Sequence, residues 1–402
     1  MSQALRLSAT SIGRFKACPT QFRYADVEGL RPVEDADALR IGTNWHALQE
    51  SYQVALLEWV KEEVEPGENP DALGLTWKDA PEFAFHQAIR HLNEAYAKVP
   101  ASKTVEEWAV ERESLVALFI GHRWHWADDE ITTVATEIPF WLPLHHPRTG
   151  MPLSANKVVR LGKIDRLITR NGILMQNEYK TTSSDVSPTS SYWPRLRLNT
   201  QVSMYDLALR DGIEGDAFEV EFPDLPLGGC LYDVTRKPTI SPKKLTQADS
   251  KAFVENGLYM EEQFAVDVTS SPDSTTYTID GWTAEITPGK KDGTFAIRET
   301  PGMFRARLVQ DIYTRPEHYF ARQEIPRTQK DRTRFRTELY AIYRSMQHAV
   351  ETGYFYHNED QCDQWGGCDY CDICQHDIDV LDGQTPDGMK RIFTPITTKE
   401  TE

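Results

Sequence analysis

The chain has 402 residues, of which 40% are hydrophobic and 26% charged, an ordinary composition for a folded protein. Its length predicts about two to three domains and a core that needs no disulfides. The formal net charge of −17 argues against a surface that is basic overall, although a local basic groove is compatible with it. No run is long and apolar enough to span a membrane, and the N-terminus lacks the apolar segment of a secretory signal. We therefore expect a cytoplasmic protein.

The first third of the chain is predicted to be helical. His46 lies in the first helix, beside an apolar stripe that includes Trp45 and Leu48. We expect one helical block over 38–128, built from three amphipathic stretches: 38–60, 80–96 and 105–126.

The middle of the chain changes to the alternating pattern of β-strands. Apolar residues alternate over 134–142, which predicts a strand. Residues 157–182 indicate two strands around Asn171-Gly172, the strongest short signal for a β-hairpin. A further short apolar strand is expected over 228–234.

Helical patterns return on both sides of a polar stretch. One helix is expected over 198–210, ending at Gly212, and another over 317–352 with a break at Pro326. Residues 267–302 are rich in Ser, Thr, Asp, Pro and Gly and predict a loop or small excursion. We therefore divide the chain into five segments: 1–37; a helical block, 38–128; a core, 129–302, with a variable insertion near 267–302; a helical and cysteine-rich segment, 303–380; and a tail, 381–402.

The predicted hairpin brings two carboxylates and a lysine together. If Asn171-Gly172 is a two-residue turn, residues whose numbers sum to 343 face each other, which pairs Asp165 with Glu178 at a Cβ separation of about 4.5–5.5 Å. Lys180 lies two residues further along, on the same face. Carboxylate pairs of this kind bind Mg²⁺ or Mn²⁺, and a neighbouring lysine can stabilise charge on a phosphate. The alternative is an ordinary solvated acid–lysine pair.

These residues carry a family resemblance that extends over most of the chain. The segments Gly162-Lys-Ile-Asp165 and Glu178-Tyr-Lys180 resemble the core motif of PD-(D/E)XK nucleases, in particular the RecB/AddB nuclease domains and the CRISPR spacer-acquisition exonucleases. The resemblance implies an α/β fold with a restriction-endonuclease-like mixed central sheet flanked by helices, an inserted helical block and a C-terminal iron–sulfur subdomain. Three further segments resemble motifs of that family: Ser8 to Cys18-Pro, Gly42-Thr-Asn-Trp-His46 and Gln201-Val-Ser-Met-Tyr205.

The resemblance also implies roles for single residues. His46 would join the two carboxylates in the metal site, whereas a lone helical histidine is otherwise a packed or surface residue. Gln201 and Tyr205 are four apart on one helix face and would line the site, or Tyr205 would simply pack. Glu137 fits an acidic position of the family or is an ordinary strand carboxylate. The implied metal ligands are His46, Asp165 and Glu178, and the implied catalytic residues are Asp165, Glu178, Lys180, Gln201 and Tyr205.

Four of the six cysteines lie within thirteen residues, which indicates a metal or cluster site. Spacing alone is compatible with zinc on Cys362, Cys368, Cys371 and Cys374. The resemblance implies instead a [4Fe–4S] cluster in which Cys18 replaces Cys371, while Cys371 stays an alternative ligand. Cys230 lies in an apolar run and is predicted to be a core residue.

A basic stretch in the last quarter is the candidate DNA contact. Between residues 303 and 348 there are ten Lys or Arg and five Asp or Glu, with aromatic residues among them. Such a pattern suits backbone contacts with base stacking, although a solvated helix face is the alternative. A second basic stretch lies over 157–170. The predicted DNA-binding residues are Arg327, Lys330, Arg332, Arg334 and Arg336.

The function that these features favour is a metal-dependent DNA nuclease. The resemblance implies an exonuclease on single-stranded or end-processed DNA that uses Mg²⁺ or Mn²⁺, with partners from recombination, repair or CRISPR adaptation. One alternative is a non-catalytic DNA-binding or assembly subunit of the same fold with a structural zinc or iron–sulfur site, and another is a zinc-stabilised interaction protein. The intact Asp165, Glu178 and Lys180 favour the enzyme.

Overall fold

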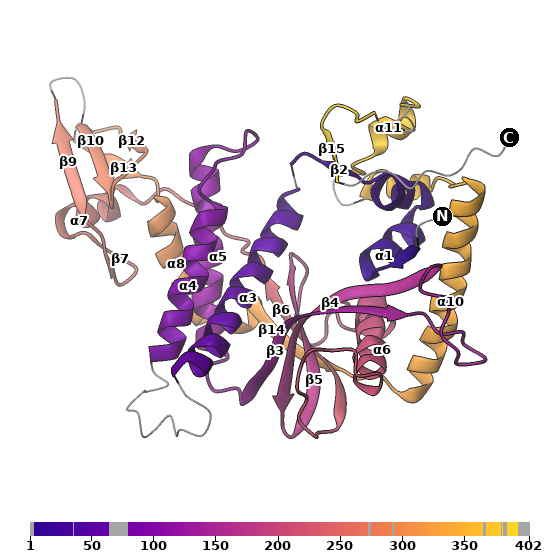
Figure 1. Ribbon diagram of the computed structural model, residues 1–402. Coiled ribbons are helices and arrows are strands. Elements are labelled where there is room, and N and C mark those ends of the chain that lie inside the picture. The colour runs from indigo at the N-terminus through magenta and orange to yellow at the C-terminus, as the bar shows by residue number, and fades with distance from the viewer. Residues whose placement is uncertain are drawn as a thin grey trace.

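A computed structural model describes residues 4–34, 36–63, 79–271, 275–291, 293–364, 367–378, 380 and 384–392. A mixed sheet lies between two layers of helices (Figure 1). One layer consists of α3 (Asp37–Glu63), α4 (Asp79–Ala95), α5 (Val105–His125) and α8 (Pro301–Thr314). The other contains α1 (Ala9–Ala17), α6 (Thr200–Glu214) and α10 (Gln329–Thr352). The three helices predicted within 38–128 are thus confirmed.

The central sheet has six strands in the order β1-β4-β5-β6-β14, with β3 on the other edge of β4. The pairs β3–β4, β4–β5 and β6–β14 are antiparallel, whereas β1–β4 and β5–β6 are parallel. The strands are β1 (Leu5–Leu7), β3 (Ile131–Pro143), β4 (Val158–Arg170), β5 (Ile173–Thr182), β6 (Leu227–Arg236) and β14 (Phe320–Ile325).

The hairpin between β4 and β5 has the predicted turn and register. Asn171 and Gly172 both adopt positive φ, at 52° and 72°, as a two-residue hairpin turn requires. In every ladder pair of β4 and β5 the two residue numbers sum to 343, as predicted, but the last pair is Arg166 with Asn177. β1 occupies the same edge of β4 only over residues 158–160, so residues 161–165 have no strand beside them there.

α6 continues past the point where the sequence predicted its end. Gly212 lies inside the helix, which ends at Glu214. A Cβ atom at position 212 would lie 2.2 Å from the ring of Phe218, so the glycine provides room for that ring. The prediction read a packing glycine as a stop signal, because local sequence does not distinguish the two.

The long helix predicted over 317–352 is also wrong in its first part. Residues 316–319 form a short helix, α9 (Pro316–Tyr319), and β14 follows as an antiparallel edge strand beside β6. Phe320 and Ile325 are buried at the ends of β14. An open sheet edge therefore overrides a local sequence that is compatible with a helix.

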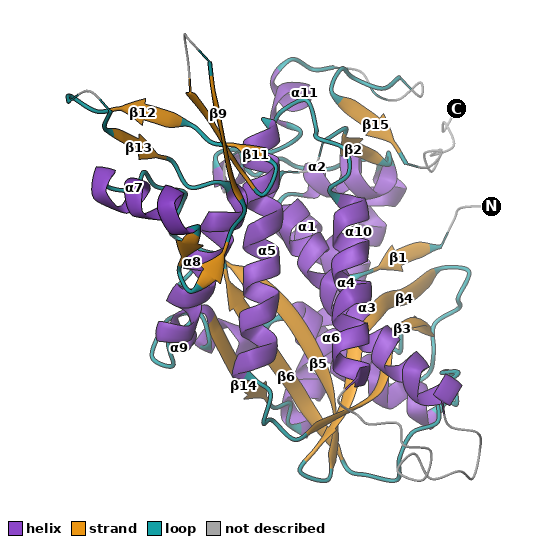
Figure 2. Cartoon of the chain, turned by 90° about the vertical axis from the view of Figure 1, so that its left-hand side faces the viewer, coloured by secondary structure: helices purple, strands orange, loops and turns teal. Residues whose placement is uncertain are grey.

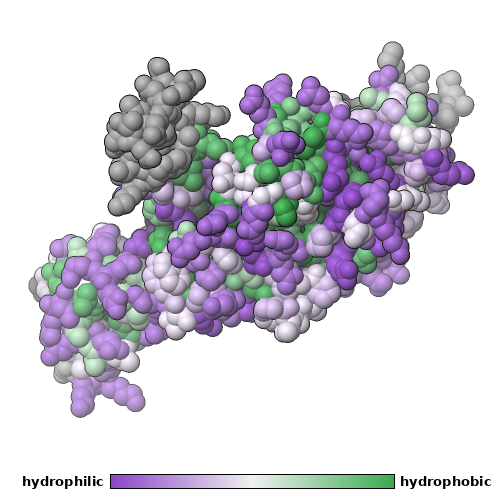
Figure 3. Space-filling model, turned by 90° about the horizontal axis from the view of Figure 1, so that it is seen from below, coloured by the Kyte–Doolittle hydropathy of each residue, from purple (hydrophilic) through white to green (hydrophobic). Residues whose placement is uncertain are grey.

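The segment 267–302, predicted as a loop or small excursion, is part of a small folded unit. Phe253, Phe264 and Ile297 form the centre of its own hydrophobic core. The unit projects from the main body, and both hydrophilic and hydrophobic residues cover the face seen in Figure 3. Its elements are α7 (Gln247–Asn256), β7 (Leu258–Tyr259), β8 (Glu262–Gln263), β9 (Val266–Ser270), β10 (Thr275–Ile279), β11 (Trp282–Thr283), β12 (Ile286–Pro288) and β13 (Phe295–Ile297).

The two end regions of the chain pack together. β15 (Met389–Arg391) pairs with β2 (Leu30–Pro32), and α11 (Cys371–Gln375) lies beside them (Figure 2). The predicted tail therefore contains a strand, while 381–383 and 393–402 lie outside the described residues. α2 (Pro19–Phe22) belongs to the same end. Within the described ranges, no helix is long and apolar enough to cross a bilayer.

Candidate active site

The candidate site lies where β4 and β5 separate. Instead of facing Glu178 in a ladder pair, Asp165 accepts a hydrogen bond from the backbone N–H of Tyr179 at 3.1 Å. Its Oδ2 also lies 3.2 Å from Nδ1 of His46, which α3 contributes from one helical layer. The open edge of β4 thus lets a helix side chain reach the carboxylate.

The second half of the site consists of two residues of β5 and one residue of α6, which belongs to the other helical layer. Glu178 is 3% exposed and forms an ion pair with Lys180, two residues along β5. Nε2 of Gln201 donates to Oε1 of Glu178 at 2.6 Å. Asn199 caps α6 by accepting a hydrogen bond from the Val202 N–H, which fixes the first turn that carries Gln201.

Tyr205 lies one helical turn beyond Gln201, packed edge-to-face against Phe140 with ring centroids 5.4 Å apart. A Cβ atom at Gly162 would lie 2.6 Å from Phe140 and 2.9 Å from Tyr205, so this glycine admits both rings. Burial raises the pKa of Tyr205 to about 12, and the charges of Glu178 and Asp165 add to the rise. Tyr205 is therefore both a packing residue and a neighbour of the carboxylates.

The pKa values of the two carboxylates are shifted in opposite directions. Burial alone would raise the pKa of Asp165, but the hydrogen bond and charge of His46, with Lys180, hold it below its ordinary value. Burial and the charge of Asp165 raise the pKa of Glu178 despite the ion pair with Lys180. For Lys180, the two carboxylates outweigh burial and raise the pKa. Separated pKa values in a shared site are typical of functional carboxylate pairs.

The donor set suits a divalent cation, although the side chains are not arranged around one. Among the residues that the structure describes, no three His, Cys, Asp or Glu side chains form a group that could hold a metal ion. His46 is bonded to Asp165, and Glu178 is bonded to Lys180 and Gln201. Two carboxylates and an imidazole are nevertheless ligands that Mg²⁺ or Mn²⁺ accepts.

Glu137 occupies a distorted position on β3. The register places it opposite Asp165, but its φ of 51° interrupts the strand. Its carboxylate forms an ion pair with Lys163. A left-handed non-glycine residue inside a strand is strained, and strain of this kind concentrates near functional sites.

The cysteine regions from the two ends of the chain meet. Asn358 donates to the Ala17 carbonyl at 2.7 Å and Thr20 donates to the Tyr356 carbonyl at 3.0 Å, which brings the C-terminal segment beside Cys18. Burial raises the pKa of Cys374 to about 11, with further contributions from Cys368, Cys18 and Cys362. The thiols of Cys362 and Cys371 are hydrogen-bonded to each other, so both predicted ligand sets lie in one neighbourhood. Cys230 is buried, as predicted.

The predicted DNA-binding stretch divides into internal and exposed residues. Arg327 is 7% exposed and donates to Ser203 Oγ and the Leu196 carbonyl. It was expected to face solvent and contact DNA, but it lies inside the protein. Two members are exposed, Lys330 and Arg334. Two others bond inside the protein: Arg332 to the Arg327 carbonyl and Arg336 to Asp211.

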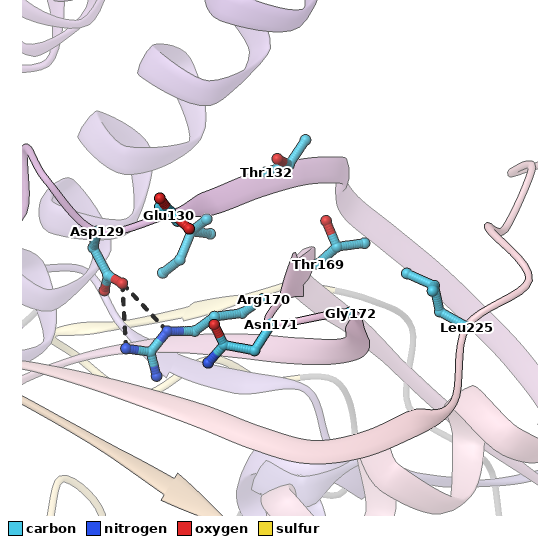
Figure 4. A pocket seen from close by; sticks show the side chains of 9 residues that line it. Asp129, Glu130, Thr132, Thr169, Arg170, Asn171, Gly172 and Leu225 are labelled. Atoms are coloured by element: carbon cyan, nitrogen blue, oxygen red, sulfur yellow. Dashed lines mark hydrogen bonds and ion pairs between the residues drawn. The ribbon is translucent and has the colours of Figure 1, made fainter.

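A separate open groove lies at the turn end of the hairpin, away from the carboxylates. Asp129, Thr132, Asn171 and Leu225 are among its lining residues. Figure 4 shows Asp129 pointing toward Arg170, to which it is ion-paired at 3.2 Å. Asp129 and Arg170 are thus paired with each other, and we assign this groove no chemistry.

The sequence prediction missed an aromatic group beside the site. Tyr192 is hydrogen-bonded to Tyr232, which faces Glu178 across the β5–β6 pairing. Burial raises the pKa of Tyr192, and the charges of Arg195 and Lys180 oppose the rise. The run Tyr192-Trp193-Pro-Arg195, directly before the glutamine helix, is the signal that could have revealed it.

Comparison with known proteins agrees with this geometry. The profile of the PD-(D/E)XK nuclease superfamily matches residues 6–375, nearly the whole chain. No curated protein gives a significant match. The chain belongs to the PD-(D/E)XK nuclease superfamily, whose members are typically metal-dependent and use Mg²⁺ or Mn²⁺. Membership in a nuclease family also implies DNA as a substrate.

Proposed function

We propose that this protein is a Mg²⁺- or Mn²⁺-dependent deoxyribonuclease that acts as an exonuclease on single-stranded or end-processed DNA. The observation that supports it is the convergence of Asp165, Glu178 and Lys180 with His46 and Gln201 at the split of β4 and β5. A non-catalytic subunit of the same fold has no need for a lysine beside two carboxylates.

The residues of the site have separable roles in this proposal. Asp165 and Glu178, with His46, would hold the metal, which when bound supplies an activated water and neutralises phosphate charge. Lys180 neutralises charge that develops on the phosphate once it moves off Glu178. Gln201 fixes the orientation of the Glu178 carboxylate by donating to it.

A comparison of linear and circular DNA tests the proposal. End-labelled linear single strands should be degraded with Mg²⁺ or Mn²⁺, circular single strands of the same sequence should stay intact, and a chelator should stop the reaction. Asp165→Ala should remove cleavage without unfolding the protein. Cutting of circles would show endonuclease action, and no metal-dependent cutting of either substrate would favour the non-catalytic subunit.

We further propose that Cys18, Cys362, Cys368 and Cys374 hold a [4Fe–4S] cluster that joins the two ends of the chain. The contacts of Asn358 with Ala17 support this set, because they place both segments side by side. Protein purified without oxygen should be brown and lose its colour in Cys18→Ser but not in Cys371→Ser. Colourless wild-type protein that contains zinc would contradict the cluster, and the reverse pattern would assign Cys371 as the ligand.

The proposed setting is cytoplasmic DNA recombination, repair or CRISPR spacer acquisition, with proteins of those pathways as partners. The resemblance of the nuclease motif and of the cysteine arrangement to enzymes of these pathways is what supports it. Recovery of such proteins with tagged Asp165→Ala protein, still bound to DNA, would test the assignment.

A further inference from the structure

The connection between β5 and α6 lies next to the carboxylates and is held by hydrogen bonds within itself. Nε1 of Trp193 donates to the carbonyls of Val186 and Ser187 at 3.1 Å, which closes the connection on itself. The connection ends in a 3₁₀-helix, Pro194–Leu198, whose Leu196 side chain is buried. A preformed element of this kind can bind a ligand without paying an ordering cost.

Arg327 fastens this 3₁₀-helix to the body of the protein. Its Nη2 donates to the Leu196 carbonyl at 2.8 Å, and its Nε donates to Ser203 Oγ on α6 at 2.9 Å. The residue that the sequence predicted as a DNA contact is therefore a buried anchor. The element that it holds carries two exposed cations of its own, Arg195 and Arg197.

Arg195 is linked to the active site through aromatic side chains. Its guanidinium lies 4.2 Å from the ring centroid of Tyr192. Tyr192 is hydrogen-bonded to Tyr232, which the register places opposite Glu178. The position of Arg195 is thus set relative to the carboxylates.

Arg195 and Arg197 are both exposed, and no carboxylate in the described part of the chain pairs with either. Many other arginines close to the sheet are ion-paired: Arg160, Arg322 and Arg336 each contact an aspartate. Arg195, which stacks on Tyr192, and Arg197 thus place two guanidinium groups without a carboxylate partner among the described residues on one five-residue 3₁₀-helix. Guanidinium groups bind phosphate oxygens in a bidentate manner.

We propose that the 3₁₀-helix Pro194–Leu198 binds the sugar–phosphate backbone of a single DNA strand beside the scissile bond, through Arg195 and Arg197. The proposal rests on the proposed nuclease function and names the element that holds its substrate. Leu198, which is 71% exposed, gives the same element an apolar surface for a base or sugar.

The test measures binding without cleavage. In Asp165→Ala protein, the affinity for a labelled single-stranded oligonucleotide is followed by anisotropy across a salt series, with and without Arg195→Ala and Arg197→Ala. The slope of log affinity against log salt is negative, and each lost phosphate contact should reduce its magnitude by about 0.7. The two changes together should therefore reduce it by about 1.4. The matched control is Lys290→Ala with Lys291→Ala, which removes two positive charges from the distant insertion.

The proposal is supported if the slope falls in the arginine variant and stays at the parent value in the lysine control. An unchanged slope in the arginine variant overturns it, as does an equal fall in both, which would reflect net charge alone. If protein with Asp165 intact cleaves DNA while the arginine variant keeps the parent slope, only this inference fails. If that protein neither binds nor cleaves DNA, the proposed function fails with it.

Discussion

The two faces of β5 both bury charged residues, but they hold them differently. On one face, Glu178 and Lys180 belong to the candidate active site. On the other face, Tyr179 lies beside Asp233 of β6, under the helical layer that contains α5. Because adjacent residues of a strand point to opposite faces, one short strand serves two polar clusters.

The cluster beneath α5 is closed. Nε2 of His122 lies 3.0 Å from Asp233, and Nε of Arg322 donates to Asp233 at 2.8 Å. Nε2 of Gln49 is 3.4 Å from the other ring nitrogen of His122, and Arg166 donates to the Tyr179 hydroxyl at 3.0 Å. Burial would raise the pKa of Asp233, but Arg322 and His122 hold it far below its ordinary value.

The difference lies in how freely the charges can rearrange. The side chains of His46 and Lys180 are 30% and 28% exposed, whereas those of His122 and Asp233 are 6% and 0% exposed. The first group can exchange its internal bonds for a metal or a phosphate, and the second cannot without opening the core. Burial of charge therefore does not by itself identify a catalytic site, and partial access to solvent must accompany it.

The largest expected effect is a loss of cleavage activity from a substitution on the active-site face of β5 but not from one on its other face. Lys180→Ala should lower cleavage by about 10²–10³-fold, because it removes the cation nearest the phosphate. Tyr179→Phe, the matched change on the other face, removes only the hydroxyl that accepts from Arg166 and should keep activity within a few-fold. Rates on labelled single-stranded DNA at saturating Mn²⁺ measure both. Equal losses in the two variants would contradict the division.

For the free energy of unfolding, we expect the larger effect from a substitution in the closed cluster beneath α5. Arg322→Met should lower the free energy of unfolding by about 3–5 kcal/mol, because it leaves the buried carboxylate of Asp233 without its guanidinium partner. Arg334→Met, on the exposed surface of α10, should change it by less than about 0.5 kcal/mol. Urea unfolding followed by circular dichroism measures both. A small effect of Arg322→Met would show that the cluster is not closed.

A smaller effect is expected from the residue that orients Glu178. Gln201→Met should weaken metal affinity by about 10–100-fold, since partners that orient a metal ligand typically contribute this much. Gln176→Met is the control, because Gln176 donates to the Val202 carbonyl and not to a carboxylate. Titration calorimetry with Mn²⁺ reports the affinity directly. Unchanged affinity in Gln201→Met would restrict Gln201 to substrate contact or packing.

The smallest effect is a pH dependence of stability from the closed cluster. Burial lowers the pKa of His122 in the folded protein, so only the unfolded chain gains that proton as the pH falls below about 6.5. The free energy of unfolding should then fall by up to about 1.4 kcal/mol per pH unit until His122 titrates in the folded state. His122→Gln should reduce this slope between about pH 5 and 6.5. Urea unfolding curves of both proteins across this pH range measure the slope of the free energy of unfolding against pH. Equal slopes in the wild type and His122→Gln would exclude His122 as the source.

Local sequence determined the parts of this protein that depend on neighbouring residues along the chain. The three helices of the first block follow from apolar spacing of 3.6 residues, and the β4–β5 register follows from the turn at Asn171-Gly172. That register was enough to bring Asp165, Glu178 and Lys180 into one region. The motif order around these residues also indicated the superfamily, because catalytic chemistry restricts the residues that a site can use.

Only the tertiary structure decided which partner each of those groups meets. Residue pattern alone did not indicate that β4 and β5 stop pairing before Asp165, because the opening depends on helices from both layers reaching the same sheet edge. In the same way, residues 320–325 became a strand because β6 offered an open edge, and Gly212 stayed in a helix because Phe218 packs on it. Arg327 is an anchor rather than a surface cation for the same physical reason. Burial and long-range pairing are set by contacts between segments far apart in the chain, which residue type and spacing do not contain.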